Sequence, residues 1–429
     1  MANQKGRKRN LGKVLGPGIL FASTAIGVSH LVQSTQAGAS YGFALLWAVI
    51  LANLFKYPFF EYGSRYASAT GTSLIDGYRK MGKSVLMIYF FISIISTFLV
   101  IAAVGFVTSG FMQNLFAIPS TNLTTIILFA ICILILISGR YNVLDKLIKL
   151  LGIVLLITTV FALVLTFIKG PQGEIGLWSK AWFPENSAGI FFLLALMGWM
   201  PTALDIGAWS SLWIIEKEKN TGYKPSLKET LFDFNFGYIS TAILSICFVS
   251  LGAFILFGTE EKLADGAAGF ASGVVGLYTT TMGQWAYPII ASCAFSIMFS
   301  TCITVIDGYS RNMKRIVEIF ALDLNLKNNK PSFWKSYRFM ILLCSLCGIS
   351  LIFVFQDSEF GMKGLVNIAT TMSFIVAPFV AIFNVLLVRK KNLGELAPPP
   401  WLRILSYLGI IFLSGFTIYF LMLKFNLSV

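Results

Sequence analysis

The sequence has little charge and a single histidine. Lys, Arg, Asp and Glu together make up 12% of the 429 residues, and His30 is the one histidine. Soluble globular domains carry about 25% charged residues, so this composition excludes an ordinary soluble protein. One histidine leaves no convincing catalytic triad, and the sequence has no P-loop for ATP-driven transport. We therefore expect neither an enzyme nor a bound cofactor.

Apolar residues fill most of the chain instead. They account for 56% of it, and the mean hydropathy is +0.78. Runs of about 18 residues or more are long enough to cross a bilayer core of about 30 Å. The sequence predicts an all-α integral membrane protein, with residues 1–429 as a single transmembrane domain and a hydrophilic loop at about 308–336. Eleven apolar runs are present, at about 15–38, 41–67, 84–114, 122–139, 147–168, 188–215, 231–258, 279–306, 337–356, 364–388 and 402–424.

The net charge is +14, and the basic residues that produce it are distributed according to the predicted topology of these spans. With the N-terminus inside, nearly all Lys and Arg fall in cytoplasmic segments, beginning with the basic tail at 1–14. This is the positive-inside pattern of a multi-pass protein, and it accounts for the charge without nucleic-acid binding. We expect a monomer in the lipid bilayer of the plasma (cell) membrane, with a cytoplasmic N-terminus and an extracytoplasmic C-terminus.

Two of the apolar runs are interrupted at matching places. The first contains Gly27-Val28-Ser29, and the second contains Met200-Pro201. Because a membrane helix must satisfy its own backbone hydrogen bonds, breaks at mid-depth survive only beside a cavity or packed protein. Paired broken helices in corresponding halves of a chain are typical of the binding site of a secondary transporter. We therefore predict a transporter that works by alternating access, with its site at the two breaks.

Polar residues near these breaks are the candidate binding residues. An imidazole can ligate a metal or carry a proton near neutral pH. A thioether suits transition metals, and a carboxylate supplies the negative charge that compensates a cation for lost water. The candidates for substrate or ion binding are Gly27, Ser29, His30, Met200, Thr202, Asp205 and Thr370, of which His30, Met200 and Asp205 are the candidate metal ligands.

Charged side chains inside the spans are rare and energetically expensive. Lys56 and Glu61 lie in the second span and Asp307 lies at the inner end of the eighth, and all three are possible charge partners. Lys56 is at least eleven residues from either end of its span at about 41–67, so its ammonium group reaches the interface poorly. Two interpretations stay open: a structural ion pair with Glu61 or Asp205, or a fixed positive charge that replaces a coupling cation or holds an anionic group.

Several stretches match a known family in order along all eleven runs. They are Gly16-Pro17-Gly18, residues 36–47, Ala52-Asn53-Leu54, Ala69-Thr70-Gly71, Phe116-Ala117-Ile118-Pro119, Met200-Pro201 and residues 366–379. In these stretches the chain resembles the natural resistance-associated macrophage protein (Nramp) family of divalent-metal transporters, within the amino acid-polyamine-organocation superfamily. The resemblance implies the leucine-transporter (LeuT-like) fold, with inverted five-helix repeats at 15–168 and 188–388 and a peripheral helix at 402–424.

The chain departs from the family at the positions that bind metal and carry protons. The family's Asp-Pro-Gly-Asn motif falls on Gly27, Val28, Ser29 and His30, and its Met-Pro-His motif reads Met200-Pro201-Thr202. A second family histidine falls at Gly207, and the acidic proton-pathway residues of the third span fall at Ile101 and Val104. The methionine ligand is therefore retained, and the sequence does not predict proton coupling by the family's route.

Two functions fit these residues. The first is a carrier of a divalent metal cation such as Mn²⁺ or Fe²⁺, bound by His30, Met200, Asp205 and backbone carbonyls near Gly27. The alternative is a carrier of a small organic or zwitterionic, amino acid-like solute, held on backbone N–H groups of the first break and paired with Lys56 or Asp205. Convergence of the three side-chain ligands on one point, away from Lys56, would favour the metal.

Overall fold

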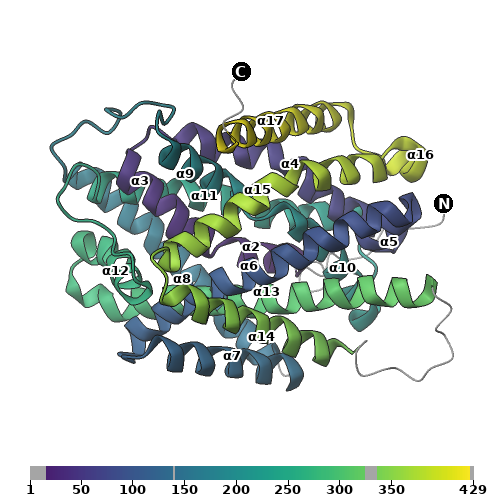
Figure 1. Cartoon of the computed structure of the whole chain (residues 1–429), viewed down its shortest axis with the longest axis horizontal. Coiled ribbons are helices and arrows are strands. Elements are labelled where there is room, and N and C mark those ends of the chain that lie inside the picture. The colour runs from purple at the N-terminus through teal and green to yellow at the C-terminus, as the bar shows by residue number, and fades with distance from the viewer. Residues whose placement is uncertain (1–15, 139–140, 324–335, 426–429) are drawn as a thin grey trace, which may run out of the picture.

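The computed structural model describes residues 16–138, 141–323 and 336–425, without the side chains of 141–152 (Figure 1). All of its regular elements are helices, as predicted. The predicted basic tail at 1–14 lies outside the described residues. In chain order the elements are α2 (Pro17–Ala25), η1 (Ser29–Ser34), α3 (Thr35–Tyr41), α4 (Leu46–Thr70), α5 (Leu74–Met81), α6 (Lys83–Phe116), α7 (Thr121–Ser138), α8 (Tyr141–Lys169), α9 (Ser187–Gly198), η2 (Leu204–Ile206), α10 (Gly207–Thr221), α11 (Leu227–Ile255), α12 (Ala267–Met282), η3 (Gln284–Ala286), α13 (Tyr287–Asp323), α14 (Tyr337–Gln356), α15 (Gly361–Leu387), α16 (Lys390–Leu393), η6 (Gly394–Leu396) and α17 (Pro400–Lys424).

Both predicted helix breaks are present. The first helix stops at Ala25 and resumes at Ser29 as a six-residue π-helix before α3 begins. The second stops at Gly198 and resumes with the short 3₁₀ turn η2 before α10. Non-helical backbone at this depth must lie in packed protein or beside a cavity. The two breaks therefore mark the part of the bundle where a solute can be held.

The helices run side by side, so that the bundle has two ends (Figure 1). We call the end with α5, α16 and the C-terminal turns of α10 the α5 face, and the opposite end with α12 the α12 face. By length and composition, seven helices of the described residues are long and apolar enough to cross a membrane. They are α6, α7, α11, η3–α13, α14, α15 and α17. The two broken helices, α4 and α8 account for the other predicted spans, and the total of eleven stays a prediction.

The eighth predicted span, at 279–306, is placed wrongly. Residues up to Met282 belong to α12, and the spanning helix α13 begins at Tyr287 and continues to Asp323, well into the predicted loop. Gly283 has φ +98°, a conformation that suits glycine and ends α12. Apolar content could not reveal this boundary, because the residues on both sides of Gly283 are hydrophobic.

Two glycines let broken-helix segments approach their neighbours closely. A Cβ built on Gly38 of α3 would lie 2.0 Å from the Val249 carbonyl oxygen of α11. A Cβ on Gly198 of α9 would lie 2.0 Å from the Thr370 carbonyl oxygen of α15. Small residues at such crossings are typical of membrane helix packing. The two half-helices nearest the α12 face are thus fixed against α11 and α15.

Candidate functional site

A small cavity lined by buried residues lies between the two breaks. It has about 20 Å³ of room for the centre of a water molecule, enough for one or two waters. Its lining comes from both breaks and from α6 and α13, and consists of Thr24, Ala25, Val28, Ser29, Val100, Val104, Trp199, Thr202, Ala203, Ile206, Thr301 and Val305. The centre of the bundle therefore holds little free space in this structure.

Three of the predicted site residues lie at this cavity. Ser29 and Thr202 line it, and a Cβ on Gly27 would lie 2.8 Å from the Thr301 side chain. Thr24 and Thr301 also line the cavity but were not predicted. Thr24 lies in the last turn of α2, directly before the first break. Its position in the sequence could therefore have identified it as a candidate. Thr301 gave no signal, because it lies in an unbroken span.

His30 faces away from this cavity. Its side chain is fully buried, and Nε2 lies 2.8 Å from the carbonyl oxygen of Thr241 on α11. Nδ1 lies 2.8 Å from the Ser29 hydroxyl. Because both ring nitrogens already lie within hydrogen-bond distance of protein atoms, this arrangement gives no support to His30 as a metal ligand. It favours a structural role that joins η1 to α11.

Met200 and Thr370 also have partners elsewhere. The Ser34 hydroxyl lies 3.8 Å from the Met200 sulfur, on the side of η1. Thr370 donates its hydroxyl back to the Val366 carbonyl of its own helix at 2.8 Å. Met200 thus lies next to η1 of the first broken helix. The Thr370 backbone packs against Gly198 at the second break.

Asp205 is the buried carboxylate nearest the second break. It is 2% exposed, in the turn η2. The Tyr309 hydroxyl donates to Oδ2 at 3.1 Å, whereas Oδ1 is buried with no hydrogen-bond partner in the structure. Buried polar atoms are nearly always paired, so an unpaired carboxylate oxygen here is a candidate ligand atom.

The other charged candidates are already paired. Glu61 binds Arg65 one turn along α4 at 2.5 Å, which gives no support to the interpretation that pairs Lys56 with Glu61. Asp307 binds Arg311 at 2.9 Å and accepts hydrogen bonds from Trp213 and Tyr337. Asp307 thereby joins α10, α13 and α14 on the α5 face. It lies toward the α5 face of the bundle and not at the helix breaks.

Lys56 lies directly against the second break. Its side chain is fully buried, and Nζ donates to the carbonyls of Met197 at 2.6 Å and Gly198 at 2.7 Å. A third carbonyl, that of Thr202, lies 3.4 Å from Nζ. Among the described residues, no carboxylate lies within 4.0 Å of this ammonium group. The interpretation as a fixed positive charge is thus favoured over a structural ion pair.

A second, larger cavity lies between the central cavity and the α5 face, and we call it the vestibule. It has about 560 Å³ of room for water and is lined in part by Leu20, Ile303 and Thr304. Leu20 lies one helical turn before Thr24 on α2, and Ile303 and Thr304 lie between Thr301 and Val305 of the central cavity on α13. The vestibule and the central cavity are therefore neighbours.

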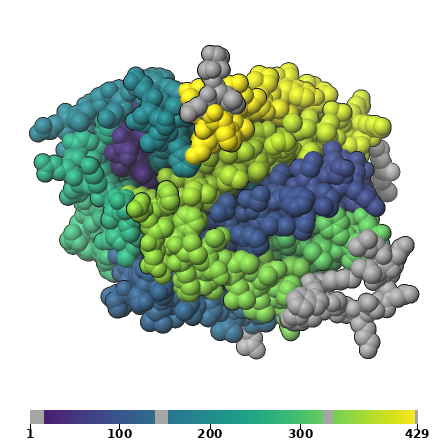
Figure 2. All heavy atoms as spheres, viewed as in Figure 1, coloured from purple at the N-terminus to yellow at the C-terminus, as the bar shows by residue number. Residues whose placement is uncertain are grey.

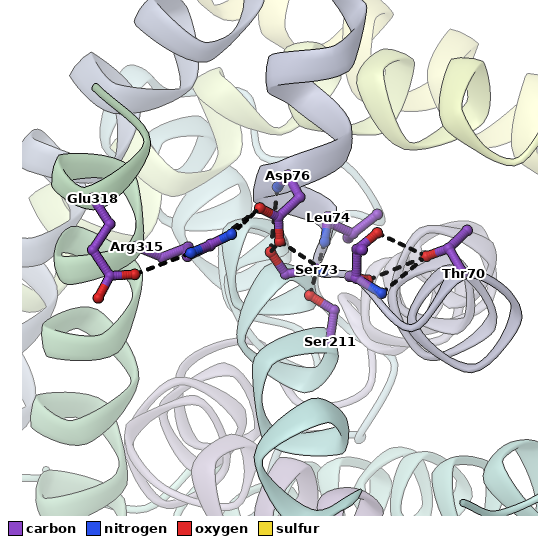
Figure 3. Close-up of polar contacts among 8 residues, drawn as sticks. Thr70, Ser73, Leu74, Asp76, Ser211, Arg315 and Glu318 are labelled. Carbon is purple, nitrogen blue, oxygen red and sulfur yellow. Dashed lines mark hydrogen bonds and ion pairs between the residues drawn. The ribbon is translucent and has the colours of Figure 1, made fainter. Parts of the chain in front are cut away.

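Helix α5 joins α10 to α13 on the α5 face (Figure 3). Asp76 caps α5 by accepting from the Ser73 backbone at 3.0 Å, and it also binds Arg315 of α13 at 2.5 Å. The Leu74 N–H donates to the Ser211 hydroxyl of α10 at 3.0 Å. Figure 2 shows the α5 region between α15 and α13, where these contacts place it. Burial alone would raise the pKa of Asp76, but hydrogen bonds from Arg315 and Ser73 outweigh it, so the pKa lies below its ordinary value.

Asp76→Asn is expected to destabilise the folded carrier by about 1 kcal/mol at neutral pH, a modest amount because the pair is partly exposed. A lowered carboxyl pKa contributes stability above its unfolded value, about 4, and loses it as the pH falls through the folded value. The stability difference between wild type and Asp76→Asn should therefore vanish at acid pH. Thermal unfolding against pH measures this, with the exposed Asp265→Asn as control. A difference that persists below the folded pKa would contradict the assignment.

No preformed metal centre is visible. Within residues 16–138, 141–323 and 336–425, no group of three or more His, Cys, Asp or Glu side chains converges as metal ligands would. Buried acidic side chains in these ranges are Glu61, Asp205 and Asp233. Asp233 accepts from the backbone N–H groups of Gly16 and Gly18, and Glu61 binds Arg65. Asp205 is therefore the one with an oxygen left over.

Comparisons with known proteins agree with this architecture. The chain is 38% identical to the uncharacterized protein PM0681 of Pasteurella multocida over 95% of this chain and 91% of that protein. It is 21% identical to the divalent metal cation transporter MntH of Lacticaseibacillus casei, over 95% and 87% of the two chains. The manganese transporter of Eremococcus coleocola, solved with an aromatic bis-isothiourea compound, has a TM-score of 0.69 at 12% identity, over 98% of this chain and 88% of that one.

The likeness in structure shows that the fold is LeuT-like, as the sequence predicted. The model of one family, described as natural resistance-associated macrophage protein-like, matches residues 18–423. That range includes both broken helices and every helix from α3 to α16. The protein therefore belongs to the Nramp family of membrane transporters.

Proposed function

We propose that this protein carries a divalent metal cation across the membrane by alternating access about its two broken helices. The observation that carries the proposal is the family match along residues 18–423. Relatives matched over most of the chain are named as divalent metal cation transporters. A small buried cavity at the two breaks, with a much larger cavity nearer the α5 face, fits alternating access about the breaks.

The proposed ligands are Asp205, Met200 and backbone carbonyls near Gly27. Asp205 supplies the charge that a dehydrating cation needs, and its Oδ1 is unpaired. Met200 supplies a soft donor, which favours transition metals over Mg²⁺. Among the described residues, no group of three or more His, Cys, Asp or Glu side chains could hold a metal, so we propose that the ligand set is completed when the helix breaks rearrange. Lys56 lies against the second break and interacts electrostatically with Asp205, so the metal is proposed on the family match and not on a convergence of ligands away from Lys56.

The proposal extends to orientation and coupling. We propose that the α5 face, with its basic segments, is cytoplasmic. The N-terminus is then inside and the C-terminus outside. We also propose that the protein is a monomer in the cell membrane. Ile101 and Val104 are buried apolar residues of α6, so a proton has no titratable carrier there. We expect transport without proton coupling along this helix.

Mn²⁺ influx into proteoliposomes tests the function. Wild type should take up Mn²⁺ saturably, and Met200→Ala should raise the half-saturating concentration about tenfold, equivalent to about 1.4 kcal/mol of lost binding. Met87→Ala, at an exposed methionine of α6, is the matched control and should behave as wild type. Folded wild-type protein without Mn²⁺ flux would sink Mn²⁺ transport, and uptake of an amino acid-like solute by the same vesicles would establish the alternative function.

A further inference from the structure

Lys56 occupies a position that a membrane protein rarely gives to a lysine. It lies within α4, ten residues after Leu46 and fourteen before Thr70, too deep for its ammonium group to reach water. Its side chain is fully buried. An unpaired charge at this depth is strongly unfavourable, so the groups around Nζ must compensate it.

Those groups are main-chain carbonyls at the end of a half-helix. The last carbonyls of any helix lack intrahelical partners and carry the negative end of the helix dipole. Here, the carbonyls of Met197 and Gly198 accept hydrogen bonds from Nζ, and that of Thr202, beyond the break, lies 3.4 Å away. An ammonium group has three N–H donors, so this cluster of three carbonyls matches it in number.

The same cluster has the chemistry of a monovalent-cation site. Neutral carbonyl oxygens replace the hydration shell of K⁺ in selective pores, and in secondary transporters the exposed carbonyls and C-terminal ends of half-helices coordinate the driving ion. Ammonium and K⁺ are similar small monovalent cations. Asp205 interacts electrostatically with Lys56 across the break, which adds a negative field at the same place.

We propose that the Met197, Gly198 and Thr202 carbonyls form a monovalent-cation site at the second helix break, and that the Lys56 ammonium group is its permanent, covalently attached occupant. Wild-type protein therefore needs no Na⁺ or K⁺ at this break. Removal of the side chain leaves a vacant carbonyl site that a small free cation fills. This inference concerns the monovalent site alone and does not depend on which solute is transported.

The test is cation rescue of a truncated lysine. Lys56→Ala removes the ammonium group and leaves space, whereas Lys56→Met removes the charge but keeps most of the volume. Each purified protein is heated in the chloride salts of NH₄⁺, methylammonium, K⁺, Na⁺ and the bulky cation N-methyl-D-glucamine at one ionic strength. The midpoint of unfolding is the readout, so no transport activity is needed.

The unfolding midpoint of wild type should not vary among the five salts, and neither should that of Lys56→Met. Lys56→Ala should unfold about 2 °C or more higher in NH₄⁺, methylammonium or K⁺ than in N-methyl-D-glucamine, once the cation reaches about ten times its Kd. If Lys56→Ala is too unstable to purify, its monodisperse yield from membranes solubilised in the same salts replaces the midpoint, with a higher yield in NH₄⁺ expected.

Three results would overturn the proposal. The first is a Lys56→Ala protein that responds to no small cation by either readout, which would leave Lys56 as a helix cap without a cation site beneath it. An equal response in wild type would place the cation elsewhere. Stabilisation of Lys56→Ala by Mn²⁺ or Mg²⁺ added to the N-methyl-D-glucamine salt, but by none of the monovalent cations, would show that the carbonyl cluster prefers divalent ions.

Discussion

Asp205→Asn is expected to lower Mn²⁺ uptake about 100-fold, the equivalent of about 2.7 kcal/mol, with the fold retained. The substitution keeps the size of the side chain, and its amide oxygen still accepts the Tyr309 hydrogen bond that Oδ2 accepts now at 3.1 Å. What is lost is the negative charge beside the second break. A divalent cation that gives up water without a carboxylate ligand lacks compensation for its dehydration.

The measurement is initial Mn²⁺ uptake by proteoliposomes that hold equal amounts of monodisperse protein. Asp357→Asn is the matched control, because Asp357 is exposed between α14 and α15. It should transport as wild type does. Uptake by Asp205→Asn at half the wild-type rate or more would show that Asp205 is not a ligand.

Gly198→Ala should destabilise the folded carrier by about 3 kcal/mol or more, at the upper end of overpacking effects. The added Cβ would lie 2.0 Å from the Thr370 carbonyl oxygen, and neither backbone can yield without separating α9 from α15. The Gly198 carbonyl also accepts from Lys56 at 2.7 Å. Displacement of this residue therefore disturbs both the packing and the compensation of a buried charge.

The midpoint of thermal unfolding, or the monodisperse yield where unfolding is not measurable, checks this result. Gly415→Ala is the control, since a Cβ on Gly415 of α17 meets nothing within 4 Å. It should be neutral or slightly stabilising, because alanine favours helix. A Gly198→Ala protein as stable as Gly415→Ala would contradict the close contact between α9 and α15.

The sequence was most informative about the helix breaks. Glycine and proline in apolar runs identified both positions. Glycine adopts backbone conformations that other residues avoid, and proline lacks the N–H that a helix needs, so both favour a break. The boundary at Gly283 was missed because α12 and α13 are both apolar, and hydropathy does not register a change of direction. The length of α13 was missed because its charged turns, which pair with α5 through Arg315, read as a loop.

The site was predictable in identity but not in orientation. Ser29 and Thr202 were expected from their closeness to the breaks, and both line the central cavity. His30 is adjacent to Ser29 in the chain, yet the π-helix turns its ring toward Thr241 on α11. Lys56 was recognised as a buried charge, but its partners are backbone carbonyls, which no side-chain pattern reveals.

The most direct test of the central claim is isothermal titration of the purified protein with Mn²⁺. Metal carriage through the breaks predicts saturable binding by wild type, about tenfold weaker binding by Met200→Ala, and no measurable binding by Asp205→Asn. Wild-type protein that is folded and monodisperse but binds no Mn²⁺ would contradict the account. Equal binding by all three proteins would do the same, because it would place the metal away from the broken helices.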